Sequence, residues 1–143
     1  MPIQKQFVFE VLDEVNIKKT KAEKIQVLKD NDCWALRDII RGSMDKSVEW
    51  DLPPGAPPYR PAEDHNAPTN LVRENKKFAY FVKGGPGAKM QKVKREQIFI
   101  GMLEGIHPVD ARLVINMINK QKPEGLNKGI VEGAFPGLVK KFI

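Results

Sequence analysis

Residues 95–120, REQIFIGMLEGIHPVDARLVINMINK, carry the pattern on which the fold prediction rests. Residues 98–103 are apolar on every side of a helix, which predicts a central core helix from about Lys89 to Glu104. Pro108 then fits the first position of a second helix, with Asp110 in its first turn. Apolar side chains recur along that helix at spacings of three and four. These helices, and the lack of any sustained alternating pattern, predict an all-α protein.

Three more short helices are predicted in the first fifty residues. Residues 5–15 carry one apolar helical face. Thr20 and Glu23 form a capping-box pattern that begins the second helix, and Asp32 is the predicted cap of the third. Cys33, the only cysteine, falls on an apolar position of that third helix. It is therefore expected to be a buried thiol, and it cannot form an internal disulfide.

Residues 51–68 contain six prolines, which exclude a helix and a central strand. The segment is expected to be extended, with polyproline stretches. The aromatic residues Trp50 and Tyr59 flank and punctuate it. An ordered surface segment is therefore favoured over a flexible linker.

Two more helices are expected around the central pair. Asn70 predicts the cap of a helix that ends at the glycine-rich breaker 84–87, and a last short helix is predicted over residues 127–134. The residues expected to be buried together are Phe99, Leu103, Leu113, Met117, Ile130 and Phe135. The whole is predicted to be one compact bundle of about seven short helices, a single helical domain over residues 1–143.

The charge is unevenly distributed along the chain. The sequence has 24 Lys and Arg against 18 Asp and Glu, a net charge of +6. Residues 1–50 net to zero, residues 51–75 to −2 and residues 76–143 to +8. A strongly basic half indicates an acidic partner, and nucleic acid is the most common one.

Basic clusters at turns beside helix starts are the candidate site. Backbone N–H groups and the helix dipole favour phosphate there as well. The candidate nucleic-acid-binding residues are Lys89, Lys92, Lys94, Arg95, Lys120, Lys122, Lys128, Lys18, Lys19 and Lys21. For any single lysine, a solubilising surface role is the alternative interpretation.

Catalysis and cofactor binding have little support in the sequence. A Ser-His pair needs a positioned base and an orienting acid, and the chain has only two serines and two histidines. One cysteine and two distant histidines cannot supply the four ligands of a structural zinc site. The glycine run at 84–89 lacks the Gly-Lys-Ser/Thr of a phosphate loop. No catalytic residue, cofactor or metal is therefore expected, and the protein is predicted not to be an enzyme.

The carboxyl-terminal third resembles part of a known family. Its helices at 95–104 and 108–120 are followed by GLNKGIVEGAFPGLV, residues 125–139. This arrangement is similar to the end of the N-terminal DNA-binding domain of ATP-dependent DNA ligases from T-even-type bacteriophages. Residues 18–30 resemble the lysine-rich entry into that domain's second helix. The whole chain also resembles an uncharacterised protein family of tailed phages of marine bacteria.

The resemblance implies an all-α bundle that grips duplex DNA through the minor groove and the backbone. It does not imply catalysis, because the Lys-x-Asp-Gly adenylation motif of the ligases is absent. The sequence thus predicts a non-enzymatic protein that contacts the backbone of duplex DNA with little sequence preference. No membrane partner is expected, and the location is expected to be cytoplasmic, in the host cytoplasm if the origin is a phage.

Two alternatives remain open from the sequence. The bundle could be a phage protein-interaction or virion structural module, with the proline-rich segment as its docking surface. A protein that sequesters a small host signalling molecule is a third possibility, without positive sequence support. Basic clusters gathered on one face would favour DNA binding, and scattered clusters would favour the interaction module.

Overall fold

The computed structural model describes residues 7–63 and 66–143. Within these ranges the chain forms seven α-helices and one 3-10 helix. They are α1 (Val8–Ile17), α2 (Lys21–Asp30), α3 (Trp34–Met44), α4 (Leu71–Glu74), η1 (Asn75–Phe81), α5 (Lys92–Gly105), α6 (Pro108–Ile118) and α7 (Lys128–Ala134). The only β-type pairings in the described residues are two isolated bridges, Asp45 with Phe142 and Trp50 with Val82. The predicted all-α fold of about seven helices is confirmed.

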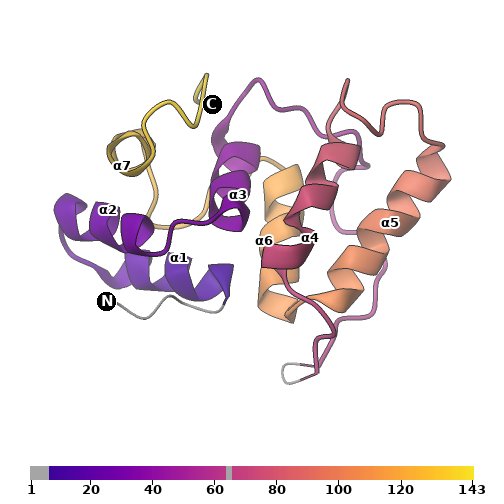
Figure 1. The fold of residues 1–143 in the computed structure, drawn as a ribbon, viewed down its shortest axis with the longest axis horizontal. Helices are drawn as coiled ribbons and strands as arrows, with labels where there is room; N and C mark the ends of the chain where they lie inside the picture. The colour runs from indigo at the N-terminus through magenta and orange to yellow at the C-terminus, as the bar shows by residue number, and fades with distance from the viewer. Residues whose placement is uncertain (1–6, 64–65) are drawn as a thin grey trace.

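The helices are arranged around a central pair, α3 and α6, which pack against each other (Figure 1). Helices α1, α2 and α7 gather on one side of this pair. Helices α4, η1 and α5 lie on the other side. In the described parts of the chain, no helix has both the length and the apolarity needed to cross a membrane.

Most helix starts follow the predicted local chemistry. The Thr20 hydroxyl accepts a hydrogen bond from the Glu23 amide at 3.2 Å, and the Asn70 side chain accepts one from the Arg73 amide at 3.0 Å. Helix α6 begins at Pro108, as predicted. Residues 5 and 6 of the first predicted helix lie outside the described residues.

The predicted cap at Asp32 is wrong. Cys33 occupies the capping position of α3, and its Sγ accepts a hydrogen bond from the Leu36 amide at 3.5 Å. Asp32 instead accepts two hydrogen bonds from the Arg37 guanidinium, at 2.6 and 2.8 Å. Because the thiol lies at a helix end and not in the interior, Cys33 is half-buried and not the buried thiol expected.

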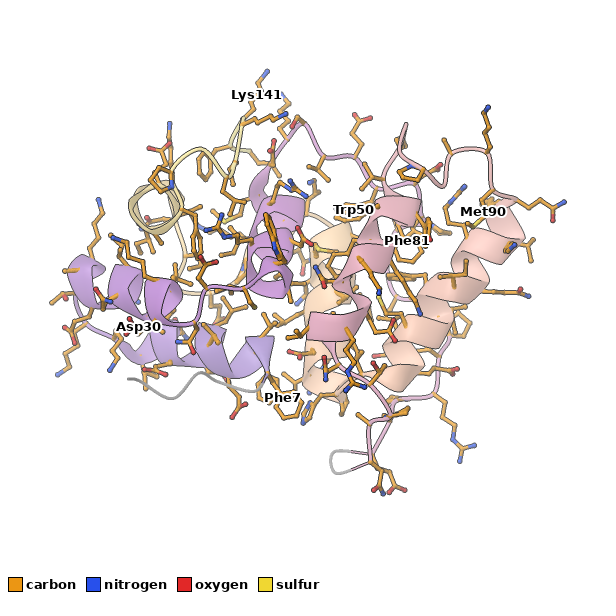
Figure 2. The ribbon with its side chains drawn as sticks, in the orientation of Figure 1. Phe7, Asp30, Trp50, Phe81, Met90 and Lys141 are labelled. Atoms are coloured by element: carbon orange, nitrogen blue, oxygen red, sulfur yellow. The ribbon has the colours of Figure 1, made fainter. Side chains whose placement is uncertain are left out.

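The predicted core is largely confirmed. Five of its six residues are buried, and Leu113 is half-buried against the same cluster. The Phe81 and Phe99 rings meet edge to face at 5.2 Å between centroids, and side chains fill the space between helices (Figure 2). Helix α5 begins at Lys92 and not at Lys89, because turns occupy the preceding residues. The end of α5 lines the core without being buried on every side, since Phe99, Met102 and Leu103 are buried and Gly101 is exposed.

The proline-rich segment is an ordered surface segment in its described part, as predicted. The Gly55 amide donates to Asn119 Oδ1 at 2.7 Å, and the Arg60 amide donates to Glu104 Oε2 at 2.7 Å. The Trp50 indole N–H donates to the Gly42 carbonyl at 3.0 Å, and Tyr59 packs partly buried against the core. These contacts hold residues 50–60 to α3, to α5 and to the end of α6.

Candidate nucleic-acid interface

The amino end of α5 presents three of the predicted lysines to solvent. Lys89, Lys92 and Lys94 are all exposed; together they are called the α5 basic end. Gln91 precedes the helix and its side chain makes no capping hydrogen bond, and no acidic residue lies in the first turn. The first amides of an α-helix have no partner within the helix. Ammonium groups, free N–H donors and the positive end of the helix dipole therefore coincide.

Arg95 must be removed from the predicted phosphate contacts. It is buried, and its guanidinium donates to the carbonyls of Asp51 at 2.9 Å and of Gly87 and Met90 at 3.3 Å each. It also forms an ion pair with the Asp51 carboxylate at 3.3 Å. Arg95 thus fixes the loop that leads into α5, and it positions the neighbouring lysines without being available to a ligand itself.

The other α-helices of the described residues differ from α5 at their amino ends. In each of them a side chain accepts a hydrogen bond from a backbone amide at the helix start. The acceptors are Asp110 for α1, Thr20 for α2, Cys33 for α3, Asn70 for α4, His107 for α6 and Asn127 for α7. Within residues 7–63 and 66–143, α5 alone has no such acceptor.

The acceptor at α1 is a buried carboxylate. Asp110 is 1% exposed, and its Oδ1 accepts the Phe9 amide at 2.9 Å. Burial raises the pKa of Asp110 to about 6, although hydrogen bonds from the amides of Phe9 and Val8 act in the lowering direction. The negative charge of Glu10 adds to the rise.

Lys120 must also be removed from the predicted contacts. Its ammonium donates to the carbonyl of Gly42 at 2.7 Å and to that of Asp45 at 2.8 Å, which ties the end of α6 to the end of α3. Burial lowers the pKa of Lys120, while the nearby charges of Asp45 and Glu49 act in the raising direction. The Lys120 ammonium therefore has a structural role, since both of its identified acceptors are backbone oxygens.

The remaining predicted lysines do not join the α5 basic end. Lys18 is half-buried, and Lys19, Lys21, Lys122 and Lys128 are exposed. They lie at or near α1, α2 and α7, across the α3–α6 pair from α5 (Figure 1). The structure thus divides the predicted set into two groups and brings only three of its members together at α5. The basic clusters are therefore not gathered on one face, which is the arrangement expected to favour the interaction module.

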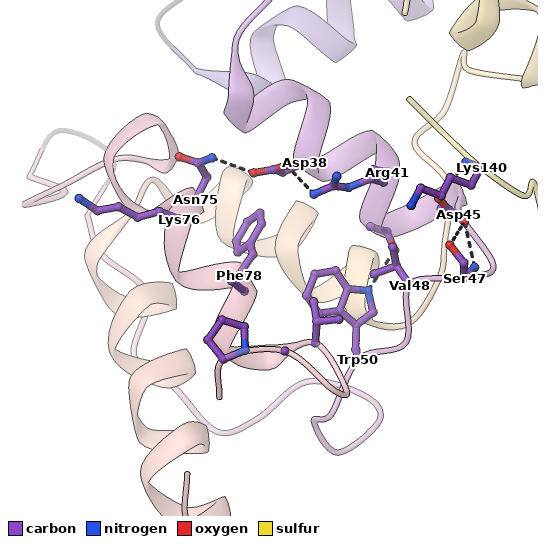
Figure 3. A pocket seen from close by; sticks show the side chains of 15 residues that line it. Asp38, Arg41, Asp45, Ser47, Val48, Trp50, Asn75, Lys76, Phe78 and Lys140 are labelled. Carbon is purple, nitrogen blue, oxygen red and sulfur yellow. Dashed lines mark hydrogen bonds and ion pairs between the residues drawn. The ribbon is translucent and has the colours of Figure 1, made fainter. Parts of the chain in front are cut away.

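A hollow of about 500 Å³ between α3 and η1 was missed by sequence reasoning. Figure 3 shows Asp38 and Arg41 of α3 in a row with Asn75, opposite Trp50 and Phe78. Asn75 Nδ2 donates to Asp38 Oδ2 at 2.8 Å, and Arg41 lies 3.3 Å from Asp38 Oδ1.

Two lysines stand at the ends of this row. Figure 3 shows Lys76 at one end of the hollow and Lys140 at the other. The backbone amides of Lys140 and Lys141 donate to the buried Asp45 carboxylate, at 3.0 and 3.4 Å. Burial acts to raise the pKa of Asp45, but these hydrogen bonds and two from Ser47 together lower it. A carboxylate that stays ionised therefore fixes the backbone that carries Lys140.

A second hollow of about 470 Å³ adjoins the first. The two share Asp38, Asn75 and Lys76, and the second adds Trp34 and Val72. We call the joined hollows the tryptophan groove, because Trp34 lines one and Trp50 the other. One signal was visible in the sequence: Trp34, Asp38 and Arg41 are spaced by four and three, which places them on one helical face.

Metal binding has no support from side-chain geometry. No cluster of three or more His, Cys, Asp or Glu suited to a metal ion occurs within the described parts of the chain.

Fold and site together define a small all-α protein with an open, basic helix end beside a groove. The chain belongs to a family of unknown function, DUF6433, whose model matches residues 11–124. That match spans α1 to α6, so it includes the α5 basic end and most of the tryptophan groove. Residues 125–139 lie outside it. A comparison with curated proteins gave no match.

Proposed function

We propose that this protein is a non-enzymatic nucleic-acid-binding protein that holds duplex DNA by its backbone at the α5 basic end. One observation carries the proposal. Among the α-helices of the described residues, α5 is the one whose amino end lacks a side-chain acceptor, and three exposed lysines surround that end. A phosphate group would meet both the free amides and the ammonium groups.

The arrangement is unfavourable without an anion. A positive charge near the amino end of a helix opposes the dipole, and such interactions are worth about 0.3–1 kcal/mol each. A bound phosphate is attracted both by the positive end of the helix dipole and by the lysine ammonium groups, which offsets their mutual repulsion. The loop before α5 is already fixed by Arg95, so little ordering of the backbone is needed on binding.

The resemblance of residues 95–139 to the phage ligase DNA-binding domain supports the same role. It also motivates the proposal of a phage origin with action in the host cytoplasm. Contacts to phosphate position a protein but do not read the bases, so little sequence preference is expected. The exposed lysines across the α3–α6 pair, Lys19, Lys21, Lys122 and Lys128, are proposed as weaker contacts because they lie apart from α5.

Fluorescence anisotropy on a random-sequence duplex across a salt series tests this function. Each phosphate neutralised contributes about −0.9 to the slope of log affinity against log salt. The double variant Lys92→Ala, Lys94→Ala is expected to reduce that slope by about 2 and to weaken binding to all sequences alike. Lys29→Ala with Arg112→Ala removes the same charge from exposed positions elsewhere and is expected to leave the slope nearly unchanged.

Two results would end the DNA proposal for this site. One is no binding of the wild type at about 50 mM salt and micromolar protein. The other is a slope that the α5 double variant does not alter. Either result would turn attention to the protein-interaction role, for which the proline-rich segment over α5 is the docking surface.

A further inference from the structure

Both tryptophans of the chain line one groove. The sequence contains two tryptophans, and they belong to the two hollows that share Asp38, Asn75 and Lys76. Trp34 is 72% exposed and Val72 beside it is 57% exposed. The Arg37 guanidinium lies 5.7 Å from the centroid of the Trp34 ring, and the rest of the indole forms an exposed apolar patch with Val72. Exposed apolar patches of this kind mark interaction sites.

The space between the tryptophans is polar and charged. The row of Asn75, Asp38 and Arg41 is joined by hydrogen bonds and an ion pair. Lys76 and Lys140 flank it, and neither forms an ion pair with another described residue. The groove thus offers two aromatic surfaces, a central donor and acceptor row, and free positive charges at its ends.

We propose that the tryptophan groove binds unpaired nucleotides of a single strand. One base stacks on exposed Trp34, a second enters the hollow beside Trp50, and the phosphates lie near Lys76 and Lys140. The inference rests on the nucleic-acid role proposed above and deepens it, because it names a single-stranded segment as a second form of ligand. Aromatic platforms interleaved with cations are the general chemistry of single-strand recognition.

A peptide partner fits the same groove less well. Aspartate is depleted at the centres of protein–protein interfaces, but the centre of this groove holds the Asp38 carboxylate, which lines both hollows. A nucleic-acid strand alternates planar bases with anionic phosphates, which matches the order of groups here. The carboxylate of Asp38 and the amide of Asn75 are suited to hydrogen bonds with base edges.

The groove is connected to the α5 basic end. Gly85 and Pro86 line the groove, and Lys89 follows three residues later along the loop that Arg95 holds. The wall of the groove on this side therefore continues along the chain into the α5 basic end. The geometry therefore suits a junction at which duplex DNA at α5 continues into an unpaired strand.

Intrinsic fluorescence of the full chain tests the groove directly, because both emitters lie in it. The wild type is titrated with oligothymidylate and, separately, with a blunt hairpin duplex. Oligothymidylate is expected to quench the tryptophan emission. Trp34→Ala is expected to weaken its binding roughly tenfold, the scale of one stacked base. Ile17→Ala, an equally exposed apolar position on α1, is the matched control and should leave the affinity unchanged.

Two further variants separate stacking from charge. Trp34→Phe keeps an aromatic ring, so it should retain most of the affinity. Trp50 is then the sole emitter, and quenching of its emission shows a base in the inner hollow. Lys76→Ala should weaken binding of the single strand, whereas Lys29→Ala should not.

The outcomes distinguish this inference from the proposed function. If oligothymidylate binds without quenching, or if Trp34→Ala and Lys76→Ala leave its affinity unchanged, the groove proposal is overturned, while duplex binding that depends on Lys92 and Lys94 still stands. If the single strand binds through the groove and the duplex does not bind, the groove stands and the α5 proposal falls. No binding of oligothymidylate overturns the groove, and a peptide or protein ligand becomes its remaining use.

Discussion

Helices α2 and α5 both begin among lysines, but their backbone amides are satisfied differently. At α2, Thr20 accepts the Glu23 amide at 3.2 Å and its hydroxyl donates to the Glu23 carboxylate at 2.9 Å. At α5, Gln91 provides no such bond and the first turn contains no acid. Both ends carry lysines, so lysine content alone does not distinguish α5, the proposed phosphate site, from α2. What separates the two ends is whether the chain has already supplied an acceptor.

The largest expected effect comes from removing the anchor of the α5 end. Arg95→Ala is expected to lower the free energy of unfolding by roughly 3–4 kcal/mol, because three carbonyls and the Asp51 carboxylate lose a charged donor. Urea unfolding followed by circular dichroism measures the loss. Arg95→Lys keeps the positive charge but lacks the planar guanidinium. Its free energy of unfolding should lie between those of the wild type and Arg95→Ala. A loss below about 0.5 kcal/mol would show that Arg95 is exposed in solution.

The amino end of α1 makes folding stability depend on pH, because its acceptor is the carboxyl group of Asp110. The pKa of Asp110 is about 6 in the fold against 3.8 for the free group, so the protonated form is favoured by folding. The stability that it contributes is fully present below about pH 4 and is lost as the pH rises through 6. Relative to Asp110→Asn, the wild type should therefore lose up to roughly 3 kcal/mol between pH 4 and 7. Parallel stability curves for the two proteins would contradict the burial of this carboxyl.

Removing the capping side chain of α2 leaves its amino end without an acceptor, as at α5. Thr20→Ala removes the capping hydroxyl and is expected to lower the free energy of unfolding by about 1 kcal/mol. Thermal unfolding measures this change. Thr20→Ser, which keeps an acceptor oxygen, is the matched control and should be close to the wild type. If Thr20→Ala is neutral, the cap contributes little in solution and the contrast with α5 loses its basis.

The smallest expected change in stability comes from adding an acidic side chain at the amino end of α5. This is the reverse of removing the cap of α2. Lys94→Glu places a carboxylate at the third helical position, where it complements the dipole. The free protein should gain about 0.5–1 kcal/mol, while affinity for duplex DNA falls. Lys46→Glu, an exposed site outside the helices, is expected to give no such gain. A variant that is both less stable and equally able to bind would refute the role of this helix end.

The fold was predictable because its signals are local. Thr20, Asn70, Asn127 and the His107-Pro108 pair each mark a helix start within a few residues of the amides that they serve. Asp32 shows the limit of such patterns. An adjacent residue took the capping position, and the carboxylate paired with Arg37 of α3 instead.

The site was only partly predictable because its decisive contacts are distant in sequence. Arg95 is enclosed by Asp51 and Lys120 by Gly42, each far along the chain. Charge counting cannot tell a lysine or arginine that serves the fold from one that faces solvent. The tryptophan groove was missed for the same reason, since its walls come from α3, from Trp50 and from the segment that begins at Leu71.

The most direct test of the account compares the two basic helix ends in one experiment. The double variant Lys92→Ala, Lys94→Ala removes two positive charges at α5. The double variant Lys19→Ala, Lys21→Ala removes two positive charges at α2. Both are measured by anisotropy on a random-sequence duplex over a salt series. The salt slope is expected to fall by about 2 in the α5 pair and to change by much less than 1 in the α2 pair. An equal or larger reduction in the α2 pair would contradict it.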